Sequence, residues 1–415
     1  MSHMPRGQAI RVFLGFAFAY FLSTVIRAIT ATLSPTLTEE LSLQASDLGL
    51  LAGAYFLGFS LTQIPLGNWL DRFGPKKVIL SFLAIAVLGS ISFAMAQTFA
   101  GLLVARVLTG IGVSACLMAP LTGYRRWFTS AAQLRSNSWM LMTGSFGMVA
   151  ATLPVQWLLP IWGWRPLFWI IALLLLAAMV LLTWLVPSWA NTPATPCAAV
   201  SPMSHTSDGG YAHILRHPYF RKMAPMGVFI YGGLVAMQTL WATPWMIQVA
   251  GWTPLQAAQG MFWLNIAMLL TFWCWGLANP WLAQRALDAD TLIRRLMPLS
   301  FVILAIIIIA GSAISTWSAA FWTLYCMSCT VVALSQPAVA MAFAPTLAGR
   351  ALAAFNLLIF SGVFVVQWGI GLIVDALRAL NWPLESAYQL AMLVYLICTL
   401  LSYFYFLLAK SHNPA

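Results

Sequence analysis

Long apolar runs separated by short polar segments make up most of the chain. A helix that crosses a bilayer needs about 20 mainly apolar residues, and the 415-residue sequence holds twelve runs of roughly this length. These runs cover residues 11–36, 47–70, 77–97, 100–122, 136–158, 166–187, 223–249, 256–283, 295–315, 317–344, 351–376 and 386–409. The pattern predicts an all-α membrane protein with twelve transmembrane helices.

The longest polar stretch, residues 188–217, divides these runs into two sets of six. It is rich in Pro, Ser and Gly, a composition that cannot support a packed core and is typical of a linker. The segment Met1-Ser2-His3-Met4 is expected to be a cloning remnant, with the natural start at Met4. The expected organisation is an N-terminal segment 1–10, a six-helix bundle 11–187, a linker 188–222, a second six-helix bundle 223–409 and a tail 410–415.

The composition supports the membrane assignment. Hydrophobic residues make up 61% of the chain and charged residues only 7%, whereas an ordinary soluble domain carries about 25% charged residues. Too few polar side chains are present to cover a water-facing surface. The protein is therefore expected to have the lipid bilayer as its surroundings.

Basic residues are distributed unequally between the two sides of the predicted membrane. With the N-terminus placed in the cytoplasm, sixteen Lys and Arg fall in cytoplasmic segments and only Arg165 and Arg378 on the opposite side. Short cytoplasmic loops are enriched in basic residues, so both termini and the linker are expected in the cytoplasm of a bacterial-type inner membrane. The same rule explains the net charge of +11 without a nucleic-acid partner.

The acidic residues argue against an enzyme. A membrane-embedded transferase or protease needs clustered Asp for Mg²⁺, an H-E-x-x-H motif, or a Ser/His pair. The 9 acidic residues are spread singly except for Glu39 and Glu40. We therefore expect no catalytic centre, no metal site and no cofactor.

Two motifs identify the family that the chain resembles. Between the second and third runs stands Gly67-Asn68-Trp69-Leu70-Asp71-Arg72-Phe73-Gly74-Pro75-Lys76-Lys77. It resembles the G-x-x-x-D-R-x-G-x-[KR]-[KR] loop of the major facilitator superfamily of secondary transporters. We call this loop the gating motif. The residues that match it are Gly67, Asp71, Arg72, Gly74, Lys76 and Lys77. The glycines are expected to allow a tight turn, and Asp71 is expected to sit against a neighbouring helix N-terminus.

The fourth run carries a second family element. Arg106, Gly110 and Gly112 resemble the R-x-x-x-G-x-G motif, whose arginine takes part in proton transfer in some members and in helix packing in others. For Arg106 we favour packing against carbonyls of a neighbouring helix. The segment after the eighth run, GLANPWLAQR at residues 276–285, lacks the acidic residue that a second copy of the loop would have.

The resemblance implies an architecture and a mechanism. Two pseudo-symmetric six-helix bundles would enclose a central cavity that opens alternately to each side of the membrane, with the substrate near the midplane. Members of this superfamily are most often monomers, and a monomer is expected here.

Arg27 is the candidate anchor of that substrate. It lies about two thirds along the first run, where a guanidinium costs at least about 2.5–3.5 kcal/mol to insert. Backbone carbonyls could compensate for this cost, or a bound anion could. The organophosphate antiporters and the anion:cation symporters of this superfamily resemble the sequence in having a substrate-binding Arg on this span. We therefore expect a small-molecule anionic substrate.

The seventh run repeats the spacing of the first. Tyr20 and Arg27 are seven residues apart, as are Tyr231 and Gln238, and each pair lies on one helical face. Organophosphate antiporters have a second Arg on this span, where the sequence has the neutral amide Gln238. We interpret its absence as a preference for a monoanion such as a carboxylate.

Further polar and aromatic groups within the runs complete the candidate site. Each of them alone is more typical of an interhelical hydrogen bond than of a ligand contact, but together with Arg27 they suit a carboxylate with an apolar or hydroxylated body. They are Tyr55, Trp241, Asn265, Asn356 and Gln367.

Coupling and direction stay open at this point. No Asp or Glu occupies a midplane position, and Asp375 and Glu385 lie at the outer ends of their runs, which disfavours export of cationic drugs. Exchange with a counter-anion, uniport, and symport with H⁺ or Na⁺ are all compatible with the sequence. Proton-coupled efflux of drugs or metabolites and a sensor that does not transport are the alternative functions.

Overall fold

The computed structural model describes residues 4–187, 211–285 and 288–409. Across these ranges every regular element is a helix. In the N-terminal half the helices are α1 (Arg6–Leu41), α2 (Ala45–Leu61), α3 (Gln63–Met95), α4 (Phe99–Val113), α5 (Ala115–Trp127), α6 (Ser130–Ala150), α7 (Leu153–Trp162) and α8 (Trp164–Leu185).

The C-terminal half contains more interruptions of helical geometry. Its α-helices are α9 (Tyr211–Arg216), α10 (Pro218–Pro225), α11 (Gly232–Ala236), α12 (Ala242–Gln248), α13 (Pro254–Gln284), α14 (Ala289–Ala310), α15 (Ser318–Cys329), α16 (Ser335–Met341), α17 (Pro345–Ala379) and α18 (Leu384–Leu408). Between them lie the π-helical segments η2 (Met226–Tyr231) and η3 (Met237–Trp241) and the 3₁₀ segments η4 (Gly311–Trp317) and η5 (Thr330–Leu334).

These elements account for the twelve predicted spans. The described part contains nine helical stretches that are long and apolar enough to cross a membrane, and α6 and α7 form a tenth that bends by 41°. One of the nine, Ala289–Met341, is 53 residues long, far more than one crossing needs. Its two parts, α14 and α15, pack against each other and therefore form two spans. The short α2 is the twelfth.

The expected loop between the second and third spans is a turn at a single residue. The chain is helical from Gln63 to Met95 except at Gly74, which has φ 77° and ψ 162°. Glycine adopts such a positive φ without steric cost. Gly67 lies within the helical part, so the expectation that both glycines make the turn was wrong for Gly67.

The predicted linker also needs a correction at its end. Residues 188–210 lie outside the described ranges, but residues 211–216 and 218–222 are helical, in α9 and α10, rather than irregular. Ile214 is fully buried, and Lys222 forms an ion pair with Asp290 at 2.6 Å. The Pro- and Ser-rich residues before this point dominate the composition of the stretch and conceal the short helices.

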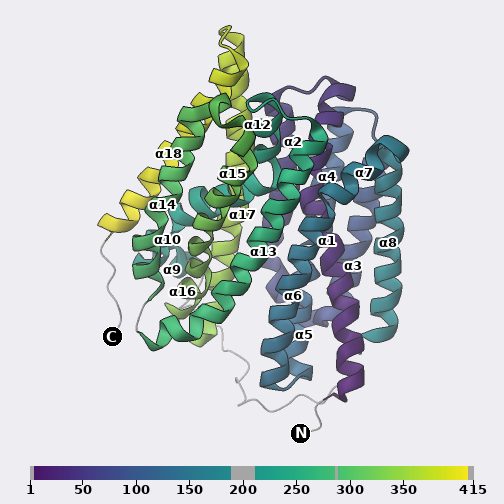
Figure 1. Ribbon diagram of the computed structural model, residues 1–415. Coiled ribbons are helices and arrows are strands. Elements are labelled where there is room, and N and C mark those ends of the chain that lie inside the picture. Colours follow the sequence, from purple (N-terminus) through teal and green to yellow (C-terminus); the bar gives the residue numbers. More distant parts are fainter. Residues whose placement is uncertain (1–3, 188–210, 286–287, 410–415) are drawn as a thin grey trace.

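The two halves form two bundles that lie side by side, purple to teal on the right of Figure 1 and green to yellow on the left. Small residues allow close helix packing inside the first bundle, as is usual in membranes. A Cβ atom on Gly110 of α4 would stand only 2.0 Å from the carbonyl oxygen of Tyr55 in α2. One on Gly112 would stand 2.2 Å from the backbone nitrogen of Ala86 in α3.

The substitution Gly110→Ala is therefore expected to destabilise the protein. Overpacking of this kind costs about 1–3 kcal/mol, so the melting temperature in detergent should fall by several degrees. Gly276→Ala is the matched control, because a Cβ there meets nothing within 4 Å and alanine favours a helix over glycine by about 1 kcal/mol. Equal melting temperatures for the two variants would contradict the close approach of α4 to α2.

The bundles meet along α2 and α17, which we call the α2–α17 seal. Its glycines permit backbone contact between the two helices. A Cβ atom on Gly49 would stand 2.3 Å from the carbonyl oxygen of Gln367. A Cβ atom on Gly371 would stand 2.3 Å from the carbonyl oxygen of Ala45. At the end of this seal the Asp375 carboxylate accepts hydrogen bonds from the backbone N–H groups of Ala45 (3.0 Å) and Ser46 (2.7 Å). A residue of the second bundle thus caps the first turn of α2.

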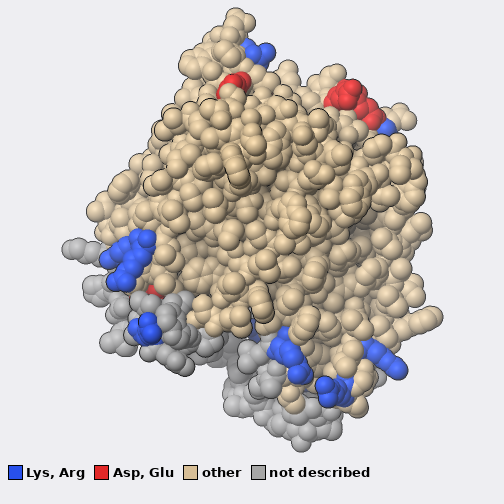
Figure 2. Space-filling view, in the orientation of Figure 1, with Lys and Arg blue, Asp and Glu red and all other residues tan. Residues whose placement is uncertain are grey.

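Charged side chains separate to the two ends of the molecule. In Figure 2 Lys and Arg gather along the lower part of the visible face, whereas Asp and Glu lie mainly at the top. We call the end where α1 begins, which includes Arg72 and Lys76, the basic end. The acidic end is the one where α1 finishes, with Glu40 and Asp375.

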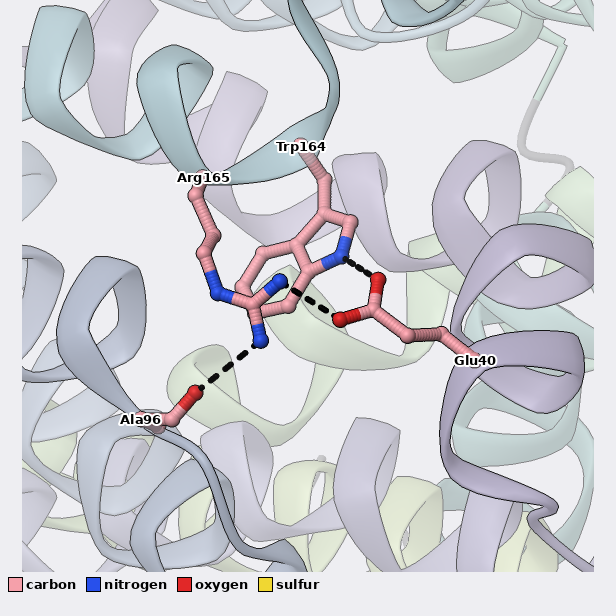
Figure 3. A network of polar contacts seen from close by, with 4 residues as sticks. All are labelled: Glu40, Ala96, Trp164 and Arg165. Atoms are coloured by element: carbon pink, nitrogen blue, oxygen red, sulfur yellow. Dashed lines mark hydrogen bonds and ion pairs between the residues drawn. The ribbon is translucent and has the colours of Figure 1, made fainter.

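Arg165 is a basic residue of the acidic end, and its charge is compensated. Its Nη1 contacts Glu40 Oε1 at 2.5 Å, and its Nη2 donates to the carbonyl of Ala96 at 3.4 Å (Figure 3). The indole N–H of Trp164 donates to the other oxygen of Glu40 at 2.6 Å. This network joins the ends of α1, α3 and α8 within the first bundle.

Candidate functional site

Arg27 lies where the two bundles face each other. Its Cζ atom is 5.5 Å from the ring centroid of Phe59 in α2 and 5.9 Å from that of Phe360 in α17. The two rings are themselves 4.5 Å apart. The guanidinium of the first bundle therefore contacts an aromatic side chain from each half of the molecule.

The charge of Arg27 has no carboxylate partner in the described ranges. The ion pairs there are Glu40 with Arg165 and Asp290 with Lys222. The buried Nε atom of Arg27 has no hydrogen-bond partner. The phenol groups of Tyr20, Tyr55 and Tyr231 lie near it, and that of Tyr55 is close enough for a side-chain hydrogen bond. The site thus has a cation and polar hydroxyls but no anion.

Arg106 is a second cation close to this centre. It is fully buried, and its Nη1 donates to the carbonyl oxygen of Ile26 at 3.0 Å. Its Cζ lies 5.0 Å from the ring centroid of Tyr55, while its Nε and Nη2 have no hydrogen-bond partner. Its bond to Ile26, the residue before Arg27, is the carbonyl contact expected from the sequence. It adds positive charge beside the Arg27 site.

Tyr231 reaches this centre from the second bundle and begins a chain of hydrogen bonds. Its hydroxyl donates to Gln336 Oε1 at 3.4 Å, and Gln336 Nε2 donates to Asn356 Oδ1 at 2.6 Å. The sequence-based site contained Tyr231 and Asn356 but missed Gln336. A polar amide within an apolar run was the signal that could have found it.

Cys116 is another neighbour of Arg27 that the sequence did not indicate. This fully buried residue near the start of α5 lies near both Arg27 and Tyr20. A single thiol in an apolar run has no pattern that distinguishes it from an ordinary packing residue.

The remaining candidates make hydrogen bonds within the second bundle. Gln238 Nε2 donates to Asn265 Oδ1 at 2.8 Å. Gln367 Nε2 donates to Thr239 Oγ1 at 3.0 Å, and the Trp241 indole donates to the Gln367 carbonyl at 3.1 Å. Gln238 is the residue of the second bundle that corresponds to Arg27 in the first. Its side chain is therefore already hydrogen-bonded to a neighbouring side chain.

The gating motif lies at the basic end of the first bundle. Lys76 Nζ donates to the carbonyls of Thr183 (2.6 Å) and Val186 (2.7 Å) and so caps the end of α8, as cations do at helix C-termini. Asp71 is exposed, with Arg125 of α5 as its charged neighbour. No hydrogen bond joins Asp71 to a helix N-terminus among the described residues. Arg72 lies over the ring of Phe73, and Lys77 is exposed.

Departures from α-helical geometry coincide with the polar side chains of the second bundle. Tyr231 ends the π-helical η2, Gln238 and Trp241 lie in η3, and Gln336 follows the 3₁₀ segment η5 by two residues. π-Bulges and mid-helix 3₁₀ stretches are frequent at functional sites. In transporters, interrupted helices typically surround the substrate.

Two curated relatives share part of the chain. The inner membrane transport protein YajR of Escherichia coli (strain K12) is 29% identical over 222 residues, which is 52% of this chain and 46% of the relative. The gallate transporter of Pseudomonas putida is 28% identical over 174 residues, 42% of this chain and 39% of the relative. The chain thus matches less than half the length of either relative.

The fold and the family are shown by comparisons that cover most of the chain. A crystal structure of a bacterial homolog of the human lysosomal transporter Spinster, inward-facing and unoccupied, superimposes with a TM-score of 0.77 at 18% identity. It covers 99% of this chain and 100% of its own. The family model of the Major Facilitator Superfamily matches residues 16–367. The chain therefore belongs to the Major Facilitator Superfamily, whose members are membrane transporters and not enzymes.

Proposed function

We propose that the protein is a secondary transporter that moves a small organic monoanion across a bacterial inner membrane by alternating access, with Arg27 as the anchor of the anion. The observation that carries the proposal is the Arg27 guanidinium between the two bundles, which has no carboxylate partner in the described ranges.

The physical argument starts from the free energy of a charge within the membrane. A guanidinium there costs at least about 2.5–3.5 kcal/mol, and aromatic faces return only about 0.5–2 kcal/mol each. A carboxylate from the substrate would supply a charge-assisted, bidentate partner. Arg106 is fully buried and donates to the Ile26 carbonyl within the first bundle, whereas Arg27 contacts a ring from each bundle. We therefore assign the anion to Arg27, and one anionic group is enough.

The surroundings of Arg27 indicate the body of the substrate. Phe59 and Phe360 provide apolar faces, and Tyr20, Tyr55 and Tyr231 provide hydroxyls. Ligand pockets combine apolar and aromatic walls with a few polar groups in this way. The relative that carries gallate, an aromatic hydroxycarboxylate, is consistent with such a substrate.

We place the basic end in the cytoplasm. Cytoplasmic loops are enriched in Lys and Arg, and the two ends of the molecule differ in this respect (Figure 2). This orientation puts both termini in the cytoplasm and the Asp375 contact on the outer side. The proposed working unit is a monomer, coupled to H⁺, Na⁺ or a counter-anion.

The test is a binding and transport panel on the purified protein. Gallate, benzoate, propionate, glycerol 3-phosphate and the cation ethidium would be compared by the shift in melting temperature, because binding to the native state raises it. We expect the largest shift from a monocarboxylate, and uptake of the same compound into proteoliposomes. Stabilisation by ethidium alone would favour drug efflux, and binding without transport would favour a sensor.

A further inference from the structure

The hydrogen-bonded chain Tyr231–Gln336–Asn356 has a defined donor direction. Tyr231 donates to Gln336 Oε1, which orients Gln336 Nε2 toward Asn356 Oδ1. The Asn356 carbonyl oxygen is therefore used, and its amide group still has two N–H donors. Amides within a membrane need partners, because an unsatisfied polar group there costs several kcal/mol.

This chain starts at the proposed anion anchor. The Tyr231 side chain lies near both Arg27 and Tyr20, across the boundary between the bundles. Asn356 lies one helical turn before Phe360 on α17, so the two share a face of that helix. Phe360 is one of the two rings beside Arg27. The amides and the cation thus belong to one centre, with one part in each bundle.

The backbone around the chain is interrupted at two of its three members. Tyr231 is the last residue of the π-helical η2, and Gln336 lies in the first turn of α16, directly after the 3₁₀ segment η5. Structural interhelical hydrogen bonds do not need such interruptions, as the bond between Gln389 of α18 and the Ile308 carbonyl of α14 illustrates.

We infer that Gln336, with Asn356, determines specificity by binding a hydroxyl group on the body of the anion that Arg27 holds. The substrate would then be a hydroxylated carboxylate: its acid group meets the first bundle and its hydroxyl meets the amides of the second. An amide can accept from a hydroxyl and donate to it. The inference rests on the proposed function and adds the substrate class.

The experiment compares matched pairs of ligands that differ only in a hydroxyl. Benzoate with 3- and 4-hydroxybenzoate, and propionate with 3-hydroxypropionate, would be titrated against the wild type and Gln336→Leu. A site built to bind a hydroxyl rejects an analogue that lacks it. We expect the wild type to bind the hydroxylated member of at least one pair at least about tenfold more tightly. In Gln336→Leu that preference should disappear while the affinity for the unhydroxylated member stays within about twofold.

Gln389→Leu is the matched control. This glutamine also lies in the second bundle, where its Nε2 donates to the Ile308 carbonyl at 2.9 Å, and its loss should leave the preference intact. The inference would be overturned if the wild type bound both ligands of every pair equally tightly. It would also be overturned if Gln336→Leu lost affinity equally for the hydroxylated and the unhydroxylated ligand. Loss of the preference in Gln389→Leu as well would also overturn it.

The failure of the proposed function would look different. Absence of binding for every carboxylate in the wild type, or full binding in Arg27→Ala, would refute the anion site itself and the inference with it. Arg27-dependent binding without hydroxyl preference would refute only the role of Gln336. Melting temperatures of all variants establish that each protein is folded before binding is compared.

Discussion

Arg27→Ala is expected to reduce the transport of the preferred carboxylate by at least about 30-fold. Removing one member of a desolvated charge pair costs about 2–5 kcal/mol, and each 1.4 kcal/mol is a factor of ten. The loss should appear in ligand affinity as well as in rate, because the guanidinium would contact the bound anion directly. Proteoliposome uptake and the ligand-induced shift in melting temperature both measure it.

Arg27→Lys should recover little of this loss. An ammonium is a compact point charge that cannot reproduce the planar, bidentate contact of a guanidinium with a carboxylate. Without ligand, Arg27→Ala should melt no lower than the wild type, because the substitution removes a half-buried charge that has no carboxylate partner in the described ranges.

Arg165→Ala is the control for the loss of an arginine. Its ion pair with Glu40 is partly exposed, with 38% of each side chain accessible, and such pairs contribute only about 0–1 kcal/mol. Transport by this variant should stay close to that of the wild type. If Arg27→Ala transported as well as Arg165→Ala, Arg27 would be a structural residue and the anion site would be refuted.

Asp375→Ala is expected to shift the protein away from the conformation with a closed α2–α17 seal. The carboxylate caps α2 from the opposite bundle, so both hydrogen bonds must break whenever the bundles separate at the acidic end. The loss of an N-cap costs about 0.5–2 kcal/mol, which corresponds to a change of about 2- to 30-fold in the ratio of closed to open molecules.

Cysteine labelling can measure this shift. Leu48 is 5% exposed and, like Asp375, lines a cavity of about 610 Å³ between the bundles at the acidic end. A Leu48→Cys probe should react with a membrane-impermeant maleimide faster when Asp375→Ala is also present. The labelling of native cysteines is subtracted with the Asp375→Ala protein that lacks the probe.

Asp47→Ala provides the matched control for the Asp375 variant. The Asp47 carboxylate accepts a hydrogen bond from the Gln44 backbone at 3.1 Å, within the same end of α2. It therefore caps α2 without bridging the two bundles. Its removal should leave the labelling rate of Leu48→Cys nearly unchanged. Equal acceleration by both substitutions would show that the stability of α2, and not the link between the bundles, controls the opening.

Much of the architecture was predictable because the signals are local. The twelve spans follow from runs of apolar residues, since every crossing must satisfy its own backbone hydrogen bonds. The motif from Gly67 to Lys77 indicated the family, and Arg27 stood out because a charge in an apolar run is costly. None of these inferences needed knowledge of contacts between distant segments.

Local composition was a poor guide to the backbone at two places. The helices at residues 211–222 follow a Pro- and Ser-rich stretch, and burial of Ile214 together with the Lys222–Asp290 pair stabilises them against the second bundle. The turn after the second span needs only Gly74, because a single residue with positive φ is enough to redirect the chain.

The sequence by itself determined the membrane class, the family and the residue that we propose as the anion anchor. Only the tertiary structure decided which side chains surround that residue. Phe360 and Tyr231 are more than 200 positions away from Arg27 in the chain, and Gln336 enters only through its bond to Tyr231. The same holds for Asp375, which lies 330 positions along the chain from Ala45, whose backbone N–H donates a hydrogen bond to it. The physical reason is that apolar runs specify each helix separately, whereas the packing of two bundles against each other specifies which faces meet.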